Sequence, residues 1–127
     1  MLVKSVLKSS LLFFEKQVDP QRIAINIGAA EGIYALLLQQ LAKKCIAFEP
    51  NPSSHAALKR ALPGVESFQA AVSARDGYTI LRVPVVNGIP YTGWATIEPN
   101  NKLAELPAHD IRARHQRRNE RDLHSHE

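Results

Sequence analysis

The sequence predicts an α/β fold of Rossmann-like type, with a doubly wound and mainly parallel sheet. Two short apolar runs, residues 22–27 and 45–49, have the composition of buried strands, and helix-like segments follow each of them. Strands that alternate with helices are typical of a parallel sheet, because each crossover between parallel strands needs a long connection. With 127 residues, 45% of them hydrophobic, the chain has room for one compact domain.

The first part of the sequence predicts a helix, a strand and a second helix. Residues 2–16 place their apolar side chains at helical spacing, so we expect an amphipathic helix within residues 1–20. The apolar run 22–27 ends at Gly28, as a buried strand ends at a tight turn. Residues 32–44 carry an apolar stripe at helical spacing and predict a second helix.

The second predicted strand, residues 45–49, is followed by a third helix. The Pro-Asn-Pro sequence at 50–52 ends the strand. Ser53 is a favourable N-cap residue, and the following residues continue as a helix to Leu62, where Pro63 and Gly64 close it.

The later part of the chain predicts two more strands and a loop. Residues 65–72 form the third strand candidate and residues 77–85 the fourth, which an Asp-Gly turn precedes. We expect a hairpin at this turn to add an antiparallel or irregular piece. Residues 87–101 predict a long loop or a short edge strand with Tyr91 and Trp94 as aromatic anchors.

Residues 108–127 contain only four apolar side chains. With so little to bury, we expect an Arg- and His-rich tail that is disordered or a frayed helix, with no assigned role. The expected organisation is thus a helix at 1–20, a partial Rossmann-like domain at 21–107 and this tail. The spacing of the tail's histidines and aspartates matches no established zinc-ligand pattern, so we predict no metal site. These residues are His109, Asp110, His115, Asp122, His124 and His126.

Composition and charge exclude several classes of protein. The single cysteine, Cys45, cannot form an internal disulfide, so we expect a cytoplasmic protein. Cys45 stands within an apolar run, and we expect it to be a buried core residue. No apolar run approaches the roughly 20 residues of a spanning helix, so we expect no membrane span. Residues 1–107 hold 11 basic against 8 acidic side chains, and residues 108–127 hold 5 against 4. Neither is a basic patch, and we expect no nucleic-acid partner.

The glycine-containing turn at 28–32 and Glu49, 21 positions after Gly28, are the most informative features. In an open parallel sheet both lie at the carboxyl edge, where ligands bind. Glycines let the backbone approach a ligand, the amides at the start of a helix favour an anion, and a carboxylate can accept hydrogen bonds from two ribose hydroxyls. The pattern predicts a nucleoside-bearing cofactor.

The residues of the turn disfavour a phosphate cofactor. A dinucleotide fingerprint starting at Gly28 requires glycines where Ala30 and Ile33 stand, and Glu31 would bring negative charge towards a pyrophosphate. A phosphate-binding loop would need a Gly-Lys pair where Ile33 and Tyr34 stand. S-adenosylmethionine has an adenosine, a sulfonium and a small carboxylate but no pyrophosphate, so it is the preferred cofactor. A dinucleotide-dependent oxidoreductase is the less favoured class of protein.

Three blocks of the sequence resemble the FkbM family of methyltransferases. Residues 26–32, Asn-Ile-Gly-Ala-Ala-Glu-Gly, resemble the family block Asp-Val-Gly-Ala-Asn-x-Gly, and residues 48–52 match Phe-Glu-Pro-x-Pro in full. Residues 71–73, Ala-Val-Ser, with Asp-Gly at 76–77, resemble a third block. The resemblance covers about residues 22–97.

The resemblance implies S-adenosylmethionine binding and methyl transfer to a hydroxyl of a sugar, lipid or natural product. It places the methionine moiety at the glycine turn, the ribose at the acid and the adenine near the third block. It names no catalytic base. The cofactor-binding residues that it implies are Asn26, Gly28, Ala29, Ala30, Gly32, Glu49, Pro50 and Ala71.

The chain departs from the family pattern at three points. The family Asp is Asn26 here, the family Asn is Ala30, and the family's later Asp-x-Glu-Gly-x-Glu block has no counterpart in residues 96–127. We therefore expect a truncated or frame-disrupted family member. The alternative is a non-catalytic nucleoside-cofactor-binding module or a degenerate methyltransferase fragment. A sheet of three or four strands would leave an edge unpaired, so we also expect a homo-oligomer or a partner chain that covers this edge.

Overall fold

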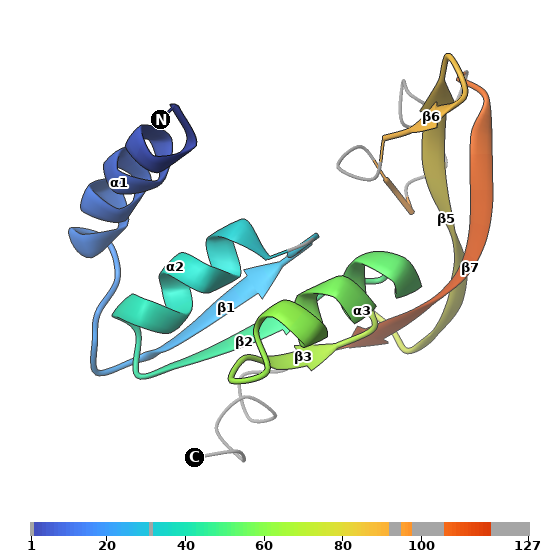
Figure 1. Ribbon diagram of the computed structural model, residues 1–127. Coiled ribbons are helices and arrows are strands. Elements are labelled where there is room, and N and C mark those ends of the chain that lie inside the picture. The colour runs from blue at the N-terminus through green and yellow to red at the C-terminus, as the bar shows by residue number, and fades with distance from the viewer. Residues whose placement is uncertain (1, 31, 92–94, 98–105, 118–127) are drawn as a thin grey trace.

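The computed structural model describes residues 2–30, 32–91, 95–97 and 106–117. Within these ranges the chain is a mixed α/β protein with one three-stranded and one four-stranded sheet (Figure 1). No helix in these ranges is long and apolar enough to cross a membrane. In chain order the elements are α1 (Leu2–Glu15), β1 (Ile23–Ile27), α2 (Ile33–Leu41), β2 (Lys44–Phe48), α3 (Pro52–Ala61), β3 (Glu66–Phe68), β4 (Ala71–Ser73), β5 (Gly77–Val86), β6 (Ile89–Pro90) and β7 (Ala108–Arg117).

The three-stranded sheet is parallel, in the order β1-β2-β3, and α2 and α3 connect its strands. Cys45 and Ala47 of the central strand point to the same face, because alternate residues of a strand share a face. Both belong to a buried cluster with Ala35 of α2 and Leu58 of α3. The two helices therefore cover the same face of this sheet, and the predicted alternation of helices and strands is confirmed here.

The opposite face of this sheet carries Ile46 and Phe48, both buried. Phe48 stacks on Phe68 of β3, with 5.3 Å between the ring centroids. Where the strands begin, Lys44 Nζ lies 2.6 Å from Glu66 Oε2. A partly exposed ion pair contributes at most about 1 kcal/mol, so the buried apolar side chains supply most of the stabilisation here.

The four-stranded sheet is mixed, in the order β4-β7-β5-β6. The strand predicted over residues 65–72 is divided: β3 joins the first sheet and β4 joins the second. The antiparallel piece expected after the Asp-Gly turn is present as β5, but the expected hairpin is wrong. The reason is that β7 lies between β4 and β5, so that Ala71 and Gly77 both pair with His115, one from each side.

Strand β7 also corrects the prediction of a disordered tail, which is wrong for residues 108–117. Ala113 and His115 are buried. Arg112, before Ala113, and Arg114, between the two buried residues, are exposed. The low apolar content misled the prediction because a strand buries only alternate side chains. β5 pairs with β7 along residues 108–115, and β4 pairs with residues 115–117 on the other side.

The predicted loop or edge strand at residues 87–101 contains the two-residue strand β6, which pairs with the end of β5. Tyr91 follows it, and its backbone N–H donates to Pro84 O at 2.8 Å. Trp94, the other predicted aromatic anchor, lies outside the described residues, as does the rest of the predicted tail at 118–127.

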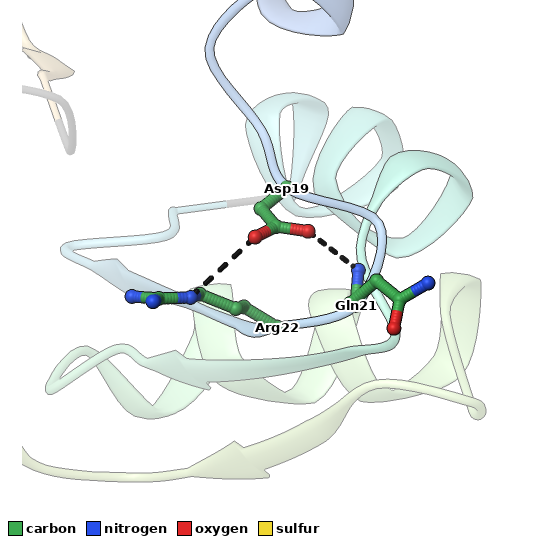
Figure 2. Close-up of polar contacts among 3 residues, drawn as sticks. All are labelled: Asp19, Gln21 and Arg22. Carbon is green, nitrogen blue, oxygen red and sulfur yellow. Dashed lines mark hydrogen bonds and ion pairs between the residues drawn. The ribbon is translucent and has the colours of Figure 1, made fainter.

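The predicted N-terminal helix is present as α1, which contacts α2. Phe14 of α1 meets Tyr34 of α2 edge to face, with 5.7 Å between the ring centroids. In the connection to β1, Asp19 Oδ1 accepts a hydrogen bond from Gln21 N at 2.9 Å, and Asp19 Oδ2 lies 3.5 Å from Arg22 Nε. Figure 2 shows how this carboxylate bridges the two residues where the chain enters β1.

Candidate functional site

The turn after β1 has an unusual backbone. Gly28, Ala30 and Gly32 have φ angles of 74°, 49° and 100°, all in the left-handed region that glycine tolerates best. The N–H groups of Gly28 and Ala29 both donate to Phe48 O, at 2.9 and 3.0 Å. These bonds hold the turn against the carboxyl end of β2.

Glu49, directly after β2, joins this turn to the start of α3. Its side chain is buried, with the residue only 6% exposed. Oε2 accepts a hydrogen bond from Ala30 N at 2.7 Å, and Oε1 accepts one from Asn51 N at 2.9 Å. Donors of this kind are required when a carboxylate is buried. The glycine turn and Glu49 thus lie at the same edge of the sheet, and we call residues 28–30, Glu49 and Asn51 the rim.

The two glycines of the turn have different surroundings. A Cβ on Gly32 would lie 2.5 Å from Leu58 Cδ1 and 3.1 Å from Leu62 Cδ1. The absence of a side chain at Gly32 therefore lets α3 pack closely against the start of α2. A Cβ on Gly28 would meet no atom within 4 Å. Gly28, unlike Gly32, borders open space, while Glu31 lies outside the described residues.

Asn26 carries a polar group without a partner. It pairs in register with Ala47 and lies on the same face of the sheet, towards the helices. Its Nδ2 atom is buried and has no hydrogen-bond partner among the described residues. An unpaired buried donor costs about 1–3 kcal/mol, so Asn26 offers a donor that a bound oxygen atom would satisfy.

The start of α3 corrects the predicted cap. Asn51 is the N-cap, because its Oδ1 accepts from Ser53 N at 3.1 Å, and Ser53 Oγ donates to the same oxygen at 2.9 Å. The prediction of Ser53 as the cap is wrong, since Pro52 already occupies the first helical position, where its fixed φ is favourable. Pro50, between Glu49 and Asn51 in the chain, is partly buried. The Asn-Pro pair was the signal that could have identified Asn51.

The predicted adenine-side residue Ala71 comes three positions after Phe68, the last residue of β3, whose backbone contacts Glu49. Phe68 O accepts hydrogen bonds from Glu49 N at 3.0 Å and from Ala70 N at 2.9 Å. Ala70 is buried, whereas Ala71 is partly buried and begins β4. The structure therefore brings Phe68 to Glu49, while Ala71 belongs to the second sheet.

Two further side chains, those of Cys45 and His55, have internal surroundings. Burial raises the pKa of the Cys45 thiol from 9.0 to about 11, so this thiol stays protonated at neutral pH. His55 of α3 has its Nε2 atom 3.1 Å from Ser67 Oγ. Over the ranges that the structure describes, no three His, Cys, Asp or Glu side chains gather in a group that could hold a metal ion.

No family model matches the chain, and the searches of curated proteins and of solved structures gave no match. The rim itself remains as the sign of a function: a glycine turn and a buried acid at the carboxyl edge of a parallel sheet in a mixed α/β protein.

Proposed function

We propose that the rim binds S-adenosylmethionine and that the chain is the Rossmann-like part of a methyltransferase of FkbM type. The observation that carries this proposal is the 2.7 Å hydrogen bond from Ala30 N to Glu49 Oε2. It holds an acidic side chain from the end of β2 beside the turn that follows β1. Ligands of open parallel sheets bind outside these carboxyl ends.

Three features of the site fit a ligand with a ribose and an amino-acid group. Each Glu49 oxygen accepts one backbone hydrogen bond, and a carboxylate oxygen has two acceptor sites, so each can accept a ribose hydroxyl as well. The unpaired Nδ2 of Asn26 is a donor suited to a carboxylate oxygen. The open space beside Gly28 leaves the backbone accessible between them.

The reaction we propose is transfer of a methyl group to a hydroxyl of a sugar, lipid or natural product. When bound, S-adenosylmethionine supplies a methyl group that its sulfonium makes electrophilic. The chain's own task is positioning: Glu49 holds the ribose and Asn26 the carboxylate end, so the two ends of the ligand are fixed. Fixing the reactants can contribute several kcal/mol to rate acceleration.

Titration calorimetry of the full chain with S-adenosylmethionine, S-adenosylhomocysteine and NAD tests the proposal. We expect the first two to bind one site, and we expect Glu49→Gln to weaken their binding about tenfold or more, because charge-assisted hydrogen bonds are lost. Glu66→Gln is the matched control, since Glu66 starts β3 at the opposite end of the sheet and should leave affinity unchanged. Saturation by NAD alone would contradict the proposal and favour the dinucleotide-dependent oxidoreductase.

A non-catalytic nucleoside-cofactor-binding module is the second candidate. It is favoured by the sequence, because Asn26 and Ala30 stand where the FkbM pattern has Asp and Asn. Release of S-adenosylhomocysteine in the presence of hydroxylated acceptors separates the two functions. Turnover supports the methyltransferase, whereas tight binding with no turnover on any acceptor supports the module.

A further inference from the structure

Strand β1 forms a margin of the three-stranded sheet (Figure 1), and within the described ranges it pairs only with β2. Arg22 O accepts a hydrogen bond from Lys43 N at 3.0 Å, and Gly28 N donates to Phe48 O at 2.9 Å. The even-numbered residues of this segment therefore direct their backbone groups to β2. Since these groups alternate along a strand in a parallel pair, those of the odd-numbered residues point away from β2.

These odd-numbered residues are Ile23, Ile25 and Ile27, which give three N–H and three C=O groups without a partner strand in the described part of the chain. Ile25 is 39% and Ile27 63% exposed. β1 has no charged residue and no proline, the features that usually protect an edge from pairing. Residues 23–25 also line a groove, together with residues 17–19 and Arg22 of the connection before β1.

We propose that this edge pairs with β1 of a second copy of the chain, antiparallel and centred on Ile25. The sequence of β1, Ile-Ala-Ile-Asn-Ile, has its isoleucines placed symmetrically about Ile25. A two-fold axis at this residue puts Ile25 opposite Ile25 of the second copy. It also puts Ile23 of each chain opposite Ile27 of the other. A symmetric dimer interface requires this kind of self-complementary pattern.

This register satisfies every outward backbone group of β1. Ile25 and its copy exchange two hydrogen bonds, and each pair of Ile23 with Ile27 exchanges two more, because alternate residue pairs of an antiparallel ladder are hydrogen-bonded. The two parallel sheets become one continuous sheet. The exposed isoleucines of both chains then gather on the same face, away from α2 and α3, and bury part of their exposed surface against each other.

Sedimentation equilibrium of the full chain tests this dimer. We expect a dimer for the native sequence and monomers for Ile25→Lys and Ile25→Glu, since each places two like charges opposite each other at the axis. A mixture of the two variants should regain the dimer mass. Ile80→Lys, at an isoleucine of β5 that is 52% exposed, is the matched control and should leave the dimer intact. A native chain that stays monomeric up to its solubility limit, or an Ile25→Lys chain as large as the native one, would overturn the proposal.

Cross-linking gives a second test that introduces no charge. In the proposed register the two Ile25 Cα atoms lie about 5.5 Å apart, within the range of a disulfide. In a Cys45→Ala background, Ile25→Cys should form a disulfide-linked dimer on mild oxidation, and Ile80→Cys should not. Equal cross-linking of both variants, or of neither, would contradict the pairing at Ile25.

Discussion

Leu58 Cδ1 occupies the place where a side chain on Gly32 would begin, because a Cβ built on Gly32 lies 2.5 Å from this atom. Leu58 is fully buried, and Gly32 has a φ of 100°. We expect Gly32→Ala to lower the free energy of unfolding by roughly 2–4 kcal/mol, from left-handed strain and overpacking together. Urea denaturation measures this loss.

Gly28→Ala separates these two causes. Gly28 has a positive φ of 74°, but a Cβ there would meet no atom within 4 Å. Only the backbone strain remains, so we expect a loss of about 1–2 kcal/mol. A loss for Gly28→Ala as large as that for Gly32→Ala would show that contact with Leu58 contributes nothing.

Ala30→Gly should stabilise the chain. Ala30 has a φ of 49°, and relief of the left-handed strain outweighs the greater chain entropy of glycine by about 0.5–1 kcal/mol. The backbone N–H that Glu49 accepts is kept. Ala56→Gly, at an exposed position within α3, is the control and should destabilise by about 1 kcal/mol. Thermal unfolding that moves both variants in the same direction would refute the strain at Ala30.

Asn51→Ala removes the cap of α3. We expect it to lower the free energy of unfolding by about 1–2 kcal/mol, because Ser53 N loses its acceptor. Ser53→Ala keeps this backbone bond and loses only the hydroxyl contact with Asn51, so its effect should be smaller. If chemical denaturation gave the larger loss for Ser53→Ala, the cap would be Ser53 after all.

Cys45 makes stability depend on pH at the alkaline end. Its pKa is raised by burial from 9.0 to about 11, so the unfolded chain loses the thiol proton at lower pH than the folded chain. The contribution is fully present below pH 9 and is lost as the pH rises towards 11, by roughly 2–3 kcal/mol. Denaturation of the native chain and of Cys45→Ala at pH 8 to 11 measures it. Parallel pH profiles for the two chains would contradict this prediction.

The elements around the rim could be predicted because their signals are local. The runs 22–27 and 45–49 are apolar and end at Gly28 and at a proline, so strands and turns follow from the residues themselves. Parallel pairing then brings Gly28 and Glu49 to one edge. The hydrogen bond from Ala30 N to Glu49 Oε2 could not be predicted, since it depends on the conformation of the turn at Ala30.

Strand β7 could not be found from apolar content. Ile111, Ala113 and His115 alternate with exposed residues, but Ala113 and His115 are weak markers of a buried face. What makes 108–117 a strand is pairing with residues of β4 and β5 that lie 24 to 44 positions earlier in the chain. Strand formation of this kind depends on neighbours that are distant in sequence.

Backbone NMR of the full chain during titration with S-adenosylhomocysteine tests most directly whether the rim holds an adenosyl ligand. We predict saturable shifts of the amide signals of Gly28, Ala30 and Asn51, the last two being the donors to Glu49. Their shifts should follow one binding curve, and the curve for Glu49→Gln should lie at about tenfold higher ligand concentration or more. No saturable shift in the native chain, or shifts confined to β5 and β7, would contradict the claim.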